Sequence, residues 1–220
     1  MRKARALSCL CVCSVFTFAG ICGGEQADPC ELDVLACQAN LYDFALDPDC
    51  DLEGELTIEV GEGELGYLEL EPDQLPEVHY GSQGGQHVFM GMRVSNAALD
   101  RYDKLLVRFG AYTECQIGEA CYNSQQGDFL CSESSADPDS GVCEFTLGER
   151  TAVLGSAKTL RVVEDGVVEE YGLIVVLDSW PVWAGQGVLR VVVLDPCEQQ
   201  GIAEHYFPSE PAAADTGASE

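Results

Sequence analysis

Short runs of apolar residues, or of apolar and polar residues in alternation, follow one another between residues 55 and 195, with glycine, aspartate and proline between them. Alternation is typical of strands, because successive side chains of a strand point to opposite faces of its sheet. No amphipathic helix of adequate length separates the runs, as a parallel sheet would require. The pattern therefore predicts antiparallel strands. They are expected at 55–60, 66–71, 86–95, 104–112, 143–147, 151–155, 158–165, 170–178 and 188–195.

Eight or nine short strands with turn signals between them predict an all-β fold, an antiparallel β-sandwich of the immunoglobulin-like kind, over residues 55–207. In the strand at 86–95, alternation separates a core face from an outer face. On the outer face a carboxylate should neutralise Arg93, and His87 should lie at the end of the strand. The core face should carry Val88, Met90, Met92 and Val94.

Three further segments lack this pattern. Residues 25–54 are acidic and contain cysteines, and their one apolar pattern, at 32–39, predicts a short helix or irregular turn in a disulfide-stapled extension. Residues 113–142 show almost no apolar periodicity, so we expect a loop without regular structure that disulfides hold in place. The tail at 208–220 has no large apolar residue and is expected to be disordered.

Residues 1–24 have the layout of a secretory signal peptide. Arg2, Lys3 and Arg5 precede an apolar run of about 16 residues, shorter than the roughly 20 of a membrane span, and small residues follow. Three cleavage sites stay open: an ordinary one that follows Ala19, a lipobox-like one at 18–22 that would leave a lipid on Cys22, and one after Gly24 that would remove Cys22. The layout predicts an exported protein.

The cysteines beyond the signal predict disulfides. An exported chain can oxidise its cysteines, whereas a zinc site needs close pairs such as C-x2-C, which the mature chain lacks. Lipidation or loss of Cys22 leaves an even number of cysteines, whose connectivity the spacing does not fix. The terminal set is Cys30, Cys37, Cys50 and Cys197, and the central set is Cys115, Cys121, Cys131 and Cys143.

The net charge of −27 excludes several kinds of partner. The signal holds three of the eleven basic residues and no acidic one, so the mature chain is nearer −30. Nucleic acids and anionic lipid surfaces repel such a chain. We therefore expect no nucleic-acid partner, and contact with a membrane only through a lipid on Cys22.

Two acidic loops raise the question of calcium. Residues 47–51 place three aspartates in alternation, like the first ligands of an EF-hand loop. The sixth and twelfth positions of that loop would be Leu52 and Ile58, where glycine and glutamate are required. A second loop, at 137–141, holds fewer acidic residues. Solvated acidic loops are the favoured interpretation.

His79 and His87 are the candidate metal ligands, with His205 as a third. Imidazole suits copper and zinc, and an open coordination position could make a catalyst. A turn between His79 and His87, and the lack of a clear third ligand, count against this site. The favoured interpretation of 81–85 is a turn that glycines permit, and we expect no bound metal or other cofactor.

Tryptophans offer a possible contact platform, whereas no motif indicates catalysis. The chain lacks G-x-S-x-G, S-x-x-K, H-E-x-x-H and the phosphate-binding G-x-x-x-x-G-K, so we do not expect an enzyme. Trp180 and Trp183 flank Pro181 and could contact a glycan or a protein. Burial as anchors of the sandwich is the commoner explanation for tryptophan.

The run YGSQGGQHVFMGMRV at 80–94 is similar to a G-x-Q-G-G-x-H segment that precedes an apolar strand ending in R-V in uncharacterised exported proteins and lipoproteins of myxobacteria-like bacteria. The strand order over roughly 55–112 and the acidic, cysteine-rich start are similar as well. The resemblance implies an extracytoplasmic location and a sandwich-like fold. It implies no activity and no catalytic residue.

These features together predict an exported protein, secreted or held at a bacterial cell envelope. It would act as a non-enzymatic binding or structural module whose sandwich loops meet an extracytoplasmic protein or glycan. The alternative is a metal-binding protein or metal-dependent enzyme that uses His79 and His87.

Overall fold

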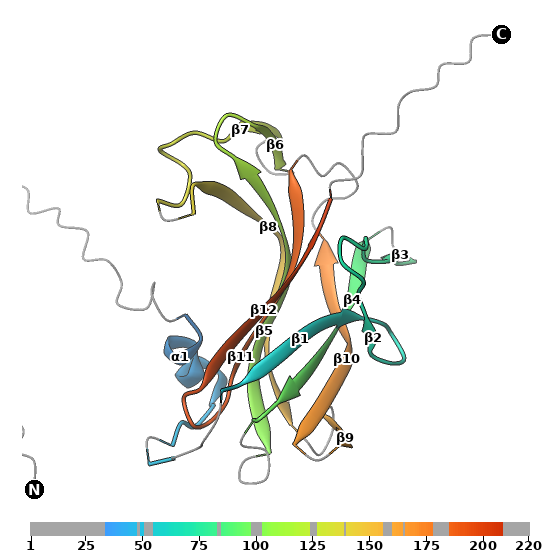
Figure 1. The fold of residues 1–220 in the computed structure, drawn as a ribbon, viewed down its shortest axis with the longest axis vertical. Helices are drawn as coiled ribbons and strands as arrows, with labels where there is room; N and C mark the ends of the chain where they lie inside the picture. Colours follow the sequence, from blue (N-terminus) through green and yellow to red (C-terminus); the bar gives the residue numbers. More distant parts are fainter. Residues whose placement is uncertain are drawn as a thin grey trace, which may run out of the picture.

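Two antiparallel sheets packed face to face make up most of the structure, a computed structural model (Figure 1). The predicted antiparallel β-sandwich is thus confirmed. The structure describes residues 34–47, 49–50, 55–82, 85–97, 103–123, 127–138, 140–155, 160–164, 166–177 and 185–208. The predicted signal peptide with Cys22, and residues 209–220 of the predicted tail, lie outside these ranges.

Each sheet draws strands from distant parts of the chain. Sheet A has the order β2-β1-β4-β10-β9, with β3 also paired to β4, and sheet B has the order β12-β11-β5-β8. The strands of sheet A are β1 (Thr57–Glu62), β2 (Leu68–Glu69), β3 (Val78–Tyr80), β4 (Gln86–Ser95), β9 (Arg161–Glu164) and β10 (Val167–Leu177). Those of sheet B are β5 (Lys104–Gln116), β8 (Val142–Gly155), β11 (Gln186–Leu194) and β12 (Gln200–Phe207). A separate hairpin pairs β6 (Ala120–Asn123) with β7 (Gly127–Leu130).

The seven longest strands follow an immunoglobulin-like order. The first, second and fifth of them, β1, β4 and β10, share sheet A, and the third, sixth and seventh, β5, β11 and β12, share sheet B. The fourth, β8, pairs with β5 in sheet B, whereas constant-type immunoglobulin domains place it in the other sheet. At Gly148 the edge strand β8 passes so close to the Val176 carbonyl of β10 that a side chain would collide there.

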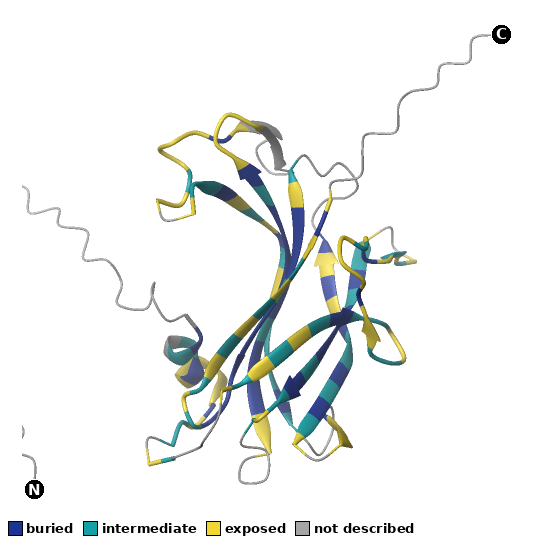
Figure 2. Ribbon diagram, viewed as in Figure 1, coloured by how far each residue is buried: buried dark blue, intermediate teal, exposed yellow. Residues whose placement is uncertain are grey.

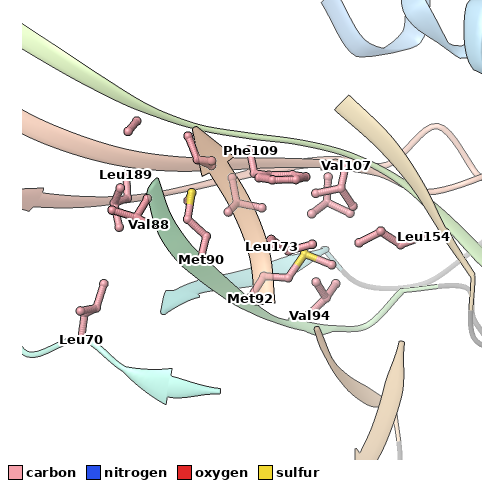
Figure 3. Packing of buried hydrophobic residues seen from close by; sticks show 14 of the residues in the cluster. Leu70, Val88, Met90, Met92, Val94, Val107, Phe109, Leu154, Leu173 and Leu189 are labelled. Atoms are coloured by element: carbon pink, nitrogen blue, oxygen red, sulfur yellow. The ribbon is translucent and has the colours of Figure 1, made fainter. Parts of the chain in front are cut away.

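The core lies between the two sheets, and buried and exposed residues alternate along the strands (Figure 2). The inward face of β4 carries Val88, Met90, Met92 and Val94, as predicted, and none of them is more than 1% exposed. They lie opposite the residues of sheet B, among them Phe109 of β5 and Leu189 of β11 (Figure 3). This apolar layer joins the sheets.

A short extension covers part of the outer face of sheet B. The helix α1 (Val34–Ala39) and the 3-10 turn η1 (Asn40–Tyr42) occupy the region where a helix or turn was expected. Leu35 and Phe44 of this extension pack against Leu106 and Val192 in a second, smaller core. The disulfide Cys50–Cys197 fastens the extension to the turn between β11 and β12. The predicted disulfide-stapled extension is therefore present.

Two disulfides are defined among the described side chains. Cys50–Cys197 joins two members of the terminal set, with Cα atoms 5.1 Å apart, and Cys131–Cys143 joins two members of the central set, 5.8 Å apart. Cys115 is also disulfide-bonded and packs beside the second pair. Cys30 lies outside the described residues, as do the side chains of Cys37 and Cys121.

Two expectations about the centre of the chain are wrong. The runs at 143–147 and 151–155 form one strand, β8, because a bulge at Leu147 lets it continue across the residues between them. The segment 113–142 contains the end of β5 and the β6–β7 hairpin, so it is not a loop without regular structure. The disulfide Cys131–Cys143 does hold this segment to β8, as expected.

The pattern also missed strands at the edges of the sheets. β12 was not expected, because its inward positions include small or polar residues, such as Ala203 and His205. Little of this strand is buried. β3 has only three residues, too few for a period to be visible. Both strands pair with partners that were predicted, β11 and β4.

The two disulfides should contribute unequally to stability. Cys50–Cys197 closes a sequence separation of 147 residues and Cys131–Cys143 one of 12. The loss of chain entropy in the unfolded state then predicts costs of about 5 and about 3 kcal/mol for removing each pair. Urea unfolding of the two double alanine variants, compared with the wild type, measures this difference. Equal losses would contradict the entropic account.

Candidate functional site

One part of the outer face of sheet A carries aromatic and aliphatic side chains in place of charges. Strand register sets His79 of β3 beside His87 of β4, and His87 beside Val176 of β10. In the next row, Phe89 of β4 lies beside Ile174 of β10. Ile174 and Val176 are 41% and 61% exposed. We name these five residues the outer apolar patch.

Three rings of this patch contact one another. The imidazoles of His79 and His87 stack with centroids 5.8 Å apart and an interplanar angle of 25°. Phe89 meets both of them at steep angles, with centroid distances of 4.7 Å to His79 and 4.9 Å to His87. Oε1 of Glu77 lies 4.0 Å from Nε2 of His79. Within the described ranges, neither imidazole has a hydrogen bond.

The third histidine lies elsewhere. Nε2 of His205 donates a hydrogen bond to the Gln74 carbonyl at 2.8 Å, which links β12 to the segment before β3. The structure therefore brings together two of the three candidate ligands. The turn that counted against a joint site instead closes the hairpin that sets His79 opposite His87. Among the residues that the structure describes, no group of three or more His, Cys, Asp or Glu is placed to hold a metal ion.

Charged side chains border the patch further along β4. The Arg93 guanidinium lies 3.1 Å from Glu59 and 2.7 Å from Glu169, which confirms that carboxylates neutralise it. It also lies 4.6 Å above the ring of Tyr67. That ring covers Gly91, where a side chain would come within 3.1 Å of it, and burial raises the pKa of Tyr67 to about 12. This part of the face is thus covered by the Tyr67 ring and by the ion pairs of Arg93.

The outer face of sheet B is polar above the extension. Arg190 of β11 forms ion pairs with Glu114 at 3.5 Å, Glu144 at 2.6 Å and Glu204 at 2.5 Å. Its guanidinium also lies over the ring of Tyr112. Burial and the neighbouring Glu144 raise the pKa of Glu114. This network pairs charges of the same chain with one another, and it contrasts with the unpaired patch on sheet A.

A buried carboxyl interrupts the core face of β10. Glu170 lies opposite Met92 at a bulge and is 9% exposed. Its Oε2 has no hydrogen-bond partner among the described residues. Burial raises the pKa of Glu170 from 4.5 to about 7, against the attraction of Arg161. Shifted carboxyls occur at functional sites, but within the described ranges no hydrogen bond joins this one to another side chain, so we assign it no chemical role.

The acidic loops act as turns. Asp47 accepts the backbone N–H of Asp49 at 3.0 Å, and Asp137 accepts the backbone N–H and the hydroxyl of Ser140. These carboxylates satisfy backbone groups in the way that aspartate does in many turns. Asp51 and Asp139 lie outside the described residues, as do Trp180 and Trp183, so the predicted aromatic platform remains a prediction.

The outer apolar patch was missed in the sequence, although a signal was present. The run Leu173–Leu177 is apolar at every position, whereas a strand with one solvated face should alternate. Since Leu173, Val175 and Leu177 are buried, the positions between them had to expose apolar groups. The sequence places His79 and His87 near each other, but their pairing depends on a register that the sequence does not reveal.

Comparison with models of protein families finds no family that matches this chain, and comparison with curated proteins finds no match either.

The Glu170→Gln variant should be more stable than the wild type at pH 8, by about 2 kcal/mol. The folded state favours the protonated carboxyl, so the unfolding free energy falls as the pH rises from 4.5 to about 7, and the variant lacks this fall. Urea unfolding of both proteins at several pH values measures this fall in the unfolding free energy. The adjacent Glu169→Gln variant, which loses the ion pair with Arg93, should instead be less stable. A Glu170→Gln variant that is destabilised at pH 8 would contradict the argument.

Proposed function

We propose that the chain is an exported cell-envelope protein without enzymatic activity, which binds a protein partner through the outer apolar patch. The observation that carries this proposal is the continuity of the patch across β3, β4 and β10. Ile174 and Val176 extend the contact area of the three rings. Apolar patches on the surface of an otherwise hydrophilic protein are typical of interaction sites.

The setting of the patch supports an interface. Outer faces of antiparallel sandwiches are commonly polar, as sheet B shows with its Arg190 network. Covering Ile174 and Val176 removes apolar surface from water, at about 25 cal/mol per Å2. The bordering charges of Arg93 and its carboxylates can form the polar rim that surrounds the centre of an interface.

The electrostatics favour a protein with basic residues around an apolar centre. The chain carries a net charge of −27, and Glu77 stands at the margin of the patch. A basic rim on the partner would speed association and exclude acidic competitors. Glycan binding generally uses an exposed aromatic face, whereas the ring of Phe89 is engaged by His79 and His87. We therefore favour a protein over a glycan.

The disulfides support an extracytoplasmic location. Cys50–Cys197, Cys131–Cys143 and the bonded Cys115 fit an oxidising compartment. In the described part of the chain, no helix is long and apolar enough to cross a membrane. Together with the signal-like start and the resemblance at 80–94, these features favour a bacterial envelope protein, with a lipid on Cys22 as its anchor.

The substitution Val176→Glu should weaken partner binding at least tenfold, about 1.4 kcal/mol, because it would bury a carboxylate at the centre of the interface. The partner is first trapped in cells by a photo-crosslinker at position 176, identified by mass spectrometry and purified. Its dissociation constant for each variant is then measured by titration.

Ile202→Glu is the matched control. Ile202 is 58% exposed and lies on β12 of sheet B, so it tests the same chemical change away from the patch. Both variants should keep the wild-type unfolding free energy within about 0.5 kcal/mol. Equal binding by the wild type and the Val176→Glu variant would refute the patch. If instead a purified glycan binds the wild type saturably and does not bind the Val176→Glu variant, the partner is a glycan and not a protein.

The intact mass of the mature protein tests the proposed location. If Cys22 is lipidated, the mature chain begins at Cys22 and carries a diacylglycerol group, with or without an added acyl chain. The Cys22→Ala variant should then take up no palmitate label. The mass should also lack two hydrogens for each disulfide. A mature protein that retains residues 1–24 with all cysteines reduced would contradict export.

A further inference from the structure

We propose that His79 and His87 form a surface site for a late divalent transition metal, and that the site binds Cu2+ most tightly. The two imidazoles supply the protein ligands, and water completes the coordination. This site does not depend on the proposed partner.

The hairpin fixes the two histidines in a position to share an ion. They are direct cross-strand partners in the β3–β4 register. Residues opposite one another in antiparallel strands have Cβ atoms about 4.5–5.5 Å apart. Imidazole nitrogens bind such metals at about 2.0 Å, so the two rings, now 5.8 Å apart, need only turn toward a common point. The His79 side chain is 32% exposed, which leaves room for that rotation.

The surroundings favour a metal in place of another hydrogen-bond partner. Phe89 contacts both rings at steep angles, and the His79 side chain is 32% exposed, so an ion can approach the pair from solvent. Within the described ranges no hydrogen bond occupies a nitrogen of either ring. Oε1 of Glu77, at 4.0 Å from Nε2 of His79, supplies a negative charge near the site. The net charge of −27 also attracts cations toward the surface.

The ligand set selects the class of metal. Imidazole nitrogens suit Cu2+, Ni2+ and Zn2+, and among divalent first-row ions affinity generally peaks at Cu2+. Calcium and magnesium prefer sets of oxygen ligands, which two imidazoles do not provide. Two protein ligands leave several coordination positions open to water, which is the arrangement of an exchangeable site and not of a closed structural one.

Titration of the mature protein with Cu2+, followed by calorimetry and electron paramagnetic resonance, tests the site. Millimolar Ca2+ in the buffer occupies the many surface carboxylates. We expect one equivalent of Cu2+ with hyperfine coupling to two nitrogens. His79→Asn and His87→Asn should each weaken binding roughly tenfold or more, with the loss of one coupled nitrogen.

His205→Asn is the matched control and should bind Cu2+ like the wild type, because His205 is held by the Gln74 carbonyl on another element. The Ile202→Glu variant, which changes an exposed residue of sheet B, should also keep copper binding and controls for an added surface carboxylate. Wild-type binding without nitrogen coupling would overturn the proposal. Unchanged affinity in a folded His79→Asn/His87→Asn double variant, checked by circular dichroism, would do the same.

Discussion

The structure depends on the contact between the inward face of β4 and sheet B. β4 is the central strand of sheet A, with β1 and β3 on one side and β10 on the other. Its buried side chains, Met90 and Met92 among them, rest on the residues that β5 and β11 turn inward. Because strand side chains alternate, this one contact also fixes what β4 presents outward, from His87 at one end to Arg93 near the other. The outer face is therefore a consequence of the core.

The two outer faces illustrate different ways of satisfying an exposed sheet. On sheet B, the extension covers one part of the outer face, and Arg190 forms ion pairs with three carboxylates on another part. Apolar and charged groups of this face thus find partners within the chain. On sheet A, Tyr67 and Arg93 cover part of the surface, and the rows that contain His87 and Phe89 remain without such a cover. A chain with so many carboxylates could have placed charges there. These rows instead hold imidazole, phenyl and aliphatic side chains.

The sequence was sufficient for the fold and insufficient for the site, for physical reasons. The strand at 86–95 was located to the residue, since a central strand with one buried face must alternate. The edge strand β12 buries little and left no pattern, and a bulge at Leu147 disguised β8 as two strands. The pairing of His79 with His87 depends on the register of a three-residue strand, and neighbouring residues alone do not set a register. Local periodicity thus reveals elements, and contacts between elements reveal sites.

The bond between Cys50 and Cys197 also has a mechanical consequence. It joins the segment that precedes β1 to the turn between β11 and β12, on the opposite sheet. Tension applied at the start of the chain therefore reaches two paired strands of sheet B through a covalent link, before it can load β1. The hydrogen bonds of β1 to β4 are then shielded from peeling, and the face that β4 displays keeps its shape under such a force.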